Sequence, residues 1–146
     1  MTSHVTVDEV LHDAALFVHL SSLILGFGAV LAVDWTALRW VLGHRPFHAV
    51  LTTAGHVHGA IWLGYAGLVA SGLLLSPNLS SAWTVVKLVL VLLIGWNGLA
   101  AMALQRHLEK SDGGPGGRGM LVASCSAGLS QACWWGATVI GFINAR

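Results

Sequence analysis

The sequence predicts an all-α integral membrane protein, folded as a four-helix bundle with up-down-up-down topology. Hydrophobic residues make up 55% of the chain and charged residues only 9%, whereas a soluble domain carries about 25% charge. The run 14–33 has no charge and lies between Asp13 and Asp34. As a helix it spans about 30 Å, the thickness of a bilayer's hydrocarbon core. A second charge-free stretch, 46–86, is long enough for two further spans.

Length, net charge and cysteine content limit which classes of protein this chain can belong to. With 146 residues and a net charge of +1, the chain is expected to form one domain, 1–146, with no basic surface for nucleic acid. Cys125 and Cys133 lie in one apolar run, where helical rise separates them by about 12 Å, too far for a disulfide. Because no basic segment precedes the run 14–33, we expect a retained span there rather than a cleaved signal peptide.

The first two helices are expected at 7–34 and 48–75. Thr6 and Glu9 have the spacing of a capping box, which favours a start near residue 7. Pro46 is a natural break before the second helix, because its ring is incompatible with a helix interior.

The third and fourth helices are expected at 83–105 and 120–143. A Ser-Pro-Asn-Leu-Ser-Ser turn precedes the third, and its last two residues, Ser80 and Ser81, are N-cap candidates. The glycine-rich segment 111–119 has the composition of a flexible linker between them.

The distribution of basic residues predicts orientation. Five of them lie in the first and third connections: Arg39, Arg45, Arg106, Lys110 and Arg118. Two lie toward the opposite side: Lys87 and Arg146. Cytoplasmic connections carry the excess of Lys and Arg, so we expect a plasma-membrane protein with both termini outside.

Depth along the helices groups the polar residues into two layers. Helical rise puts His19 about 8 Å and Lys87 about 6 Å in from the outer face. The inner layer is expected to comprise Asp34, at the end of the first helix, with His56, His58 and Asn97.

Helical periodicity predicts which side chains point inward. His19 shares a face with Ser22 and Gly26, and Lys87 lies on one face of the third helix. His56 lies with small residues, so it is the predicted interior histidine of the second helix, with His58 at an edge or cofactor wall. On the fourth helix the polar and aromatic stripe is Ser124, Gln131, Trp135 and Thr138.

An inward histidine in such a bundle can ligate haem iron, bind a metal or relay protons. For haem b, His19 supplies the imidazole, Gly26 and Gly98 could leave a slot, and Lys87 could meet a propionate or act as second ligand. The alternatives are a His19 ring bonded to a neighbouring hydroxyl or amide such as Gln131, and a Lys87 that snorkels to the interface.

Copper or another metal is the alternative ligand. The candidates are His19 and an inner pair of His56 and Asp34, although Asp34 could instead cap its helix or pair with Arg39. The spacing of His56 and His58 puts their rings on nearly opposite faces, so they cannot chelate one ion together.

Two segments carry a family resemblance. The stretch 19–26, His-Leu-Ser-Ser-Leu-Ile-Leu-Gly, resembles the first helix of the CopD and HemJ type of membrane proteins, and 83–91, Trp-Thr-Val-Val-Lys-Leu-Val-Leu-Val, is similar to their third helix. This resemblance implies a compact helical membrane bundle. HemJ-like members oxidise protoporphyrinogen with haem b, using a histidine and a lysine that correspond to His19 and Lys87, and CopD-like members are linked to copper uptake.

We therefore expect a haem-b-binding membrane redox protein, and the resemblance to HemJ-like proteins implies a haem-dependent oxidoreductase. The alternatives are a protein that handles copper or another metal, and a non-catalytic membrane subunit or scaffold. Besides the lipid bilayer, the expected partners are a second copy of the chain or a membrane redox protein. The candidate cofactor-binding residues are His19, Lys87, His56, His58, Gln131 and Trp135; the candidate metal ligands are His19, His56 and Asp34.

Overall fold

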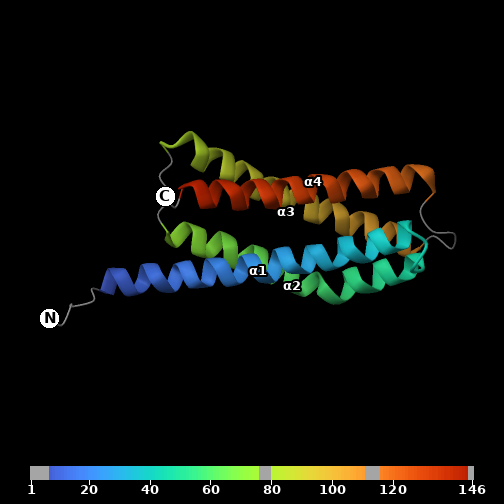
Figure 1. Ribbon diagram of the computed structural model, residues 1–146, viewed down its shortest axis with the longest axis horizontal. Coiled ribbons are helices and arrows are strands. Elements are labelled where there is room, and N and C mark those ends of the chain that lie inside the picture. The colour runs from blue at the N-terminus through green and yellow to red at the C-terminus, as the bar shows by residue number, and fades with distance from the viewer. Residues whose placement is uncertain (1–6, 76–79, 111–115, 145–146) are drawn as a thin grey trace. The chain divides into compact units, whose positions relative to one another are not determined.

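The computed structural model describes residues 7–75, 80–110 and 116–144 and contains four helices in these ranges (Figure 1). The helices are α1 (Val7–Val41), α2 (Phe47–Leu74), α3 (Ala82–Glu109) and α4 (Gly117–Asn144). The described residues contain no strand. The predicted all-α class with four helices is confirmed.

α1 continues well beyond the predicted end at Asp34. Nothing in 35–41 breaks a helix, and the helix ends where Gly43 adopts a φ of +74°. The His44 N–H donates to the Arg39 carbonyl (2.8 Å) and the Gly43 N–H to the Trp40 carbonyl (2.9 Å). This pattern is a Schellman motif, for which glycine is favoured because it has no Cβ. Arg39 and Trp40 therefore belong to the last turn of α1, not to a connecting loop.

The other helix starts are close to the predicted ones. α2 begins directly after Pro46, as expected. Ser81 occupies the N-cap of α3 with extended backbone (φ −82°, ψ 124°), but its side chain makes no capping hydrogen bond.

α3 extends four residues further than predicted, and α4 begins three residues earlier, at Gly117. The glycines of 117–119 thus belong to a helix rather than to the predicted linker. Thr6 of the predicted capping box, the turn 76–79 and the linker part 111–115 lie outside the described residues.

Three helices, α1, α2 and α3, are long and apolar enough to cross a membrane. α4 has the same 28 residues as α2 and α3 but is not in this group among the described residues. Gln131 and several serines lower its apolar character. The first three predicted spans therefore have the required length and composition, and the fourth stays a prediction.

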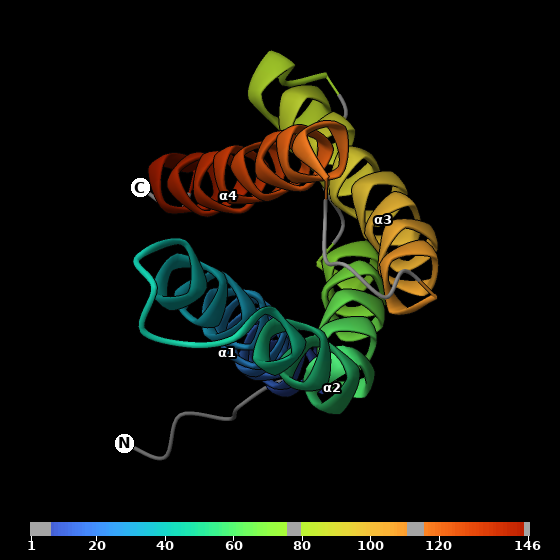
Figure 2. The same ribbon diagram turned by 90° about the vertical axis from the view of Figure 1, so that its right-hand side faces the viewer.

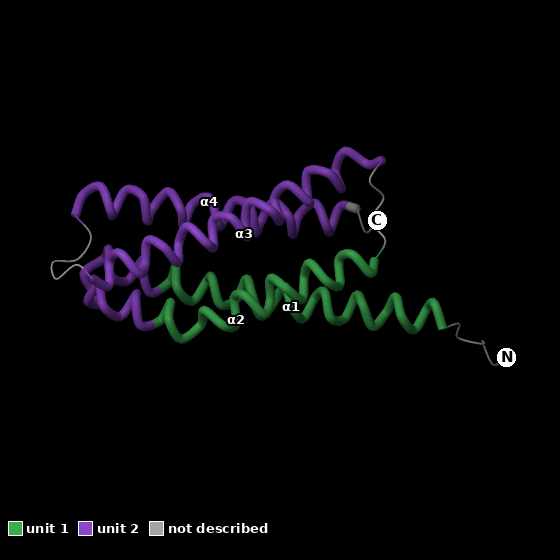
Figure 3. The backbone as a smooth tube through the Cα atoms, turned by 180° about the vertical axis from the view of Figure 1, so that it is seen from behind, with its two compact units in different colours: residues 1–35, 53–77 green, residues 36–52, 78–146 purple. Residues whose placement is uncertain are grey.

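The chain divides into two compact units (Figure 3). Unit 1 comprises 1–35 and 53–77, which is most of α1 and α2. Unit 2 comprises 36–52 and 78–146, which is the α1–α2 turn with α3 and α4.

Within unit 1, α1 and α2 run side by side in both ribbon views (Figure 2). Their backbones meet at Gly64, where an added Cβ would lie 2.5 Å from the Gly26 Cα and 2.8 Å from the Ser22 carbonyl oxygen. At Gly67 an added Cβ would collide with the Ser22 side chain. Along this contact the residue numbers increase on α1 while those of their partners decrease on α2, so the two helices are antiparallel. Small residues here allow the close approach typical of membrane helices.

Within unit 2, α3 and α4 are also antiparallel neighbours. Asn97 and Ser126 bond reciprocally: Asn97 Nδ2 donates to the Ser126 carbonyl, and Ser126 Oγ donates to Asn97 Oδ1, both at 3.0 Å. Further along, Leu90 packs against Gly136. Trp134, only 1% exposed, is the largest fully buried side chain.

Candidate functional site

The candidate site in unit 1 is centred on His19, which is half-buried where α1 meets α2. Its Nδ1 lies 3.0 Å from Ser71 Oγ, and Ser71 is 1% exposed. An added Cβ on Gly72 would lie 3.6 Å from His19 Cε1, so the ring rests against the backbone of α2. The absence of a side chain at residue 72 makes room for the imidazole.

The hydrogen bonds of Ser71 determine which nitrogen of His19 carries the proton. Ser71 Oγ lies 2.5 Å from the carbonyl oxygen of Gly67, one turn earlier on α2. A hydroxyl has one hydrogen, and this short contact to an oxygen that only accepts directs it to Gly67. His19 Nδ1–H must then donate to Ser71 Oγ. In the neutral ring this arrangement puts the lone pair on Nε2, the tautomer suited to a metal ligand.

The inward face predicted for the first helix is confirmed, because His19, Ser22 and Gly26 all contact α2. The hydroxyl partner of His19 is Ser71, which the sequence reasoning did not identify. The available signal was spacing: Gly67 and Ser71 are separated by one helical turn and share the small-residue face of α2.

The predicted cofactor slot at Gly26 is wrong. Instead of leaving space, Gly26 receives the backbone of α2 at Gly64. Two glycines opposite one another allow the helices to close until their backbones touch. A porphyrin therefore has no room between α1 and α2 at this level.

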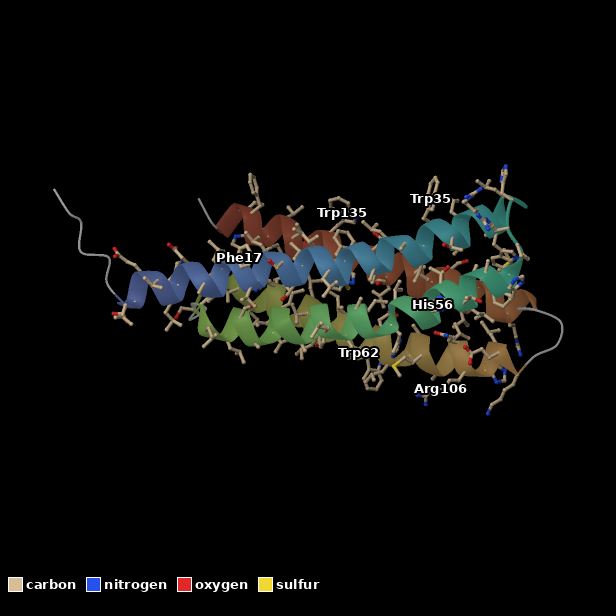
Figure 4. The ribbon with its side chains drawn as sticks, turned by 90° about the horizontal axis from the view of Figure 1, so that it is seen from below. Phe17, Trp35, His56, Trp62, Arg106 and Trp135 are labelled. Atoms are coloured by element: carbon tan, nitrogen blue, oxygen red, sulfur yellow. The ribbon has the colours of Figure 1, made fainter. Side chains whose placement is uncertain are left out.

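The structure reverses the predicted exposure of the two α2 histidines. His56, labelled in Figure 4, is exposed, whereas His58 is half-buried. The face of α2 that packs on α1 is set by Gly64 and Ser71, and Leu63, on the predicted face, is 66% exposed.

His58 starts a row of rings along α2. Its ring packs edge-on to Trp62, with centroids 6.3 Å apart, and Trp62 packs edge-on to Tyr65 at 5.7 Å. These two contacts place His58 on the same side of α2 as Trp62 and Tyr65.

The two alternative metal candidates, His19 and the pair of His56 and Asp34, belong to no three-ligand group of described residues, and each stays a prediction. Among the described residues, no three His, Cys, Asp or Glu side chains are grouped to hold an ion. Helical rise explains the result, because fifteen residues of α1 separate His19 from Asp34 by about 22 Å. Asp34 also lies inside α1 rather than at its end.

The remaining candidates belong to unit 2. Lys87 is half-buried on α3, and its Nζ lies 3.7 Å from the position that a Cβ on Gly141 would take. Gln131 is half-buried on α4. Trp135 is 54% exposed, so the predicted inward stripe of the fourth helix is wrong at this residue, and the neighbouring Trp134 is buried instead. Because His19 is in unit 1 and Lys87 in unit 2, their pairing stays a prediction.

A comparison with known protein families, curated proteins and solved structures found no match for this chain. The chemistry of the site therefore rests on its own residues. It consists of an imidazole whose Nδ1 is anchored to a buried hydroxyl, in a helix pair of membrane-spanning character.

Proposed function

We propose that this chain is an integral membrane protein that binds haem b through His19 and takes part in electron transfer. The observation that supports the proposal is the bond from His19 Nδ1 to Ser71 Oγ. Ligating histidines usually donate their second ring N–H to a neighbouring group, which fixes the ring and its tautomer. Here Ser71 Oγ is the acceptor of that N–H, and the tautomer it favours carries a lone pair on Nε2, as an axial ligand requires.

The donor fits haem b, and the close α1–α2 packing limits where the ring could lie. Gly64 and Gly26 exclude a macrocycle between the two helices at their level, so His19 Nε2 would meet the iron outside that contact. When bound, haem supplies reversible one-electron exchange at its iron. Lys87 is the proposed partner of a propionate or of the iron, as the resemblance to the CopD and HemJ type of proteins implies.

The proposal also covers the membrane, the orientation and the partners of the protein. We propose that α4 is the fourth span, that the protein resides in the plasma membrane, and that both termini lie outside. The proposed partner is a membrane redox protein or a second copy of the chain. A metal-handling function is less well supported, because no group of metal ligands is present among the described residues.

The test is the haem content of protein purified from haem-replete cells. Wild type should show a Soret band, and His19→Ala should lose it while remaining folded and membrane-inserted. His12→Ala is a matched control, since His12 lies on the same helix and is exposed. The proposal fails if wild type retains no haem when haem is supplied, or if His19→Ala keeps a full complement with an unchanged spectrum. A colourless protein with stoichiometric copper would favour the metal function.

Lys87 is tested in the same preparation. Lys87→Ala should weaken haem retention or shift the reduction potential, because a propionate or ligand partner is lost. Lys87→Arg should be milder if only the positive charge matters. Equal haem retention and potential in both variants and wild type would remove Lys87 from the site.

A further inference from the structure

One end of unit 2 concentrates positive charge. The α1–α2 turn, the end of α3 and the start of α4 lie at this end (Figure 1). Many side-chain nitrogens are drawn there, toward the right in Figure 4. We call the following five residues the basic collar: Arg39, Arg45, Arg106, Lys110 and Arg118. Four of the five are exposed, and Arg39 is half-buried.

The five basic residues of the collar outnumber the acidic residues close to them in sequence, which are Asp34, Glu109 and Asp112. Glu109 is the one acidic residue in the described part of unit 2, and its Oε1 accepts a hydrogen bond from Gln105 Nε2 at 2.9 Å. Three exposed histidines add further nitrogen groups at the same end: His44, His48 and His107. This surface therefore carries a net positive charge, which attracts anions.

An aromatic pair marks the depth of the collar. Trp40 and Phe47 pack at 4.9 Å across the α1–α2 turn, with an interplanar angle of 56°. Tryptophan rings are enriched at the headgroup level of a bilayer, so Trp40 marks that level. Arg39 precedes Trp40 in sequence, and Arg45 lies two residues before Phe47, so the guanidinium groups lie at or just beyond that level.

From these placements we infer that the basic collar binds the phosphate groups of anionic phospholipids. Guanidinium groups bind phosphate oxygens through charge-assisted and often bidentate hydrogen bonds. A cluster of four to eight basic residues immediately beside membrane helices is the sequence pattern of anionic-lipid recognition. The apolar helices hold the collar at the layer where such phosphates are most concentrated. This inference is independent of haem.

The test uses the full chain, purified in detergent, with titrations of dioleoyl phosphatidylglycerol and dioleoyl phosphatidylcholine followed by native mass spectrometry and thermal unfolding. We expect phosphatidylglycerol to bind more tightly and to raise the melting temperature more than phosphatidylcholine does. The variant Arg45→Gln/Arg106→Gln should bind phosphatidylglycerol about 30-fold more weakly, since each basic residue near a membrane surface contributes about a fivefold effect.

Three comparisons separate the inference from its alternatives. Arg45→Lys/Arg106→Lys should recover most of the binding, whereas His56→Gln, a change outside the collar, should leave it unaltered. Sodium phosphate alone should not reproduce the stabilisation; if it does, the site binds free phosphate and the lipid assignment is wrong. Equal binding of both lipids, or phosphatidylglycerol binding unchanged in Arg45→Gln/Arg106→Gln, would also overturn it.

Discussion

At the scale of single residues, the Ser71 hydroxyl connects the backbone of α2 to the ring of His19. It donates to the Gly67 carbonyl of its own helix and accepts from Nδ1 of His19. A buried serine in this position orients a second residue while satisfying its own donor. The imidazole is thereby held in one tautomer without any charged neighbour in the bond.

Ser71→Ala should loosen this arrangement. With no acceptor for Nδ1–H, the ring loses its orientation, and we expect about 10- to 100-fold weaker haem binding, the usual effect of removing a group that orients a metal ligand. Haem titration and the reduction potential measure the effect. Ser71→Thr keeps the hydroxyl and should restore both. If Ser71→Ala matches wild type in affinity and potential while His19→Ala loses haem, Ser71 does not position His19.

The Asn97–Ser126 bonds provide a second test at this scale. A double-mutant cycle with Asn97→Ala and Ser126→Ala should show a coupling of about 0.5–2 kcal/mol, the range found for hydrogen bonds between membrane helices. Unfolding in mixed micelles is the measurement. Additive effects would mean that the two bonds do not contribute jointly to the α3–α4 contact.

Residue-level prediction succeeded on α1 and failed on α2 and α4 for a physical reason. On α1, His19 and Ser22 are polar enough to identify the packed face against its aliphatic surroundings. α2 is apolar or small almost all round, so periodicity does not distinguish a lipid-facing side from a helix-facing side. His56, which was predicted to point inward, is therefore exposed. On α4, two tryptophans are adjacent, and the buried one is Trp134 rather than Trp135.

At the scale of helices, the contact between α1 and α2 depends on a glycine. Gly64→Ala should destabilise the pair by about 1–3 kcal/mol, because its new methyl group would press on the Gly26 backbone. Gly59→Ala on the same helix is the matched control, since nothing lies within 4 Å of a Cβ there. Thermal unfolding in detergent measures both. An equal effect at residues 59 and 64 would contradict the close contact.

Helix boundaries were predictable where the chain carries a backbone signal. Pro46 correctly marked the start of α2. Asp34 misled because a charge limits a hydrophobic run without ending a helix, and the true end of α1 is the left-handed Gly43. The prediction took the end of the apolar run as the end of the helix, although a helix can continue beyond the part that lies in the membrane.

At the scale of the whole molecule, the charge count predicts orientation. Five basic residues in or next to the first and third connections, against two toward the other side, favour a cytoplasmic 111–119 segment and an external N-terminus. In intact cells, a membrane-impermeant maleimide should label Ser3→Cys but not Ser111→Cys, in a chain whose native Cys125 and Cys133 are replaced by serine.

Permeabilised cells provide the control, because both sites should then react. Labelling of Ser111→Cys from outside would reverse the orientation. The basic collar would then lie in the outer leaflet, and the proposed outer layer of His19 and Lys87 would lie on the cytoplasmic side.

The length of α1 has a consequence for the membrane around it. Its 35 residues measure about 52 Å, whereas the charge-free part between Asp13 and Asp34 measures about 30 Å. About 10 Å of helix therefore extends past each aspartate. In a thicker bilayer these carboxylates would lie in the hydrocarbon core. In a thinner one, α1 would have to tilt or the bilayer around it would have to thicken. The unfolding temperature in vesicles should pass through a maximum as acyl chains lengthen, which would confine the protein to bilayers of matching thickness.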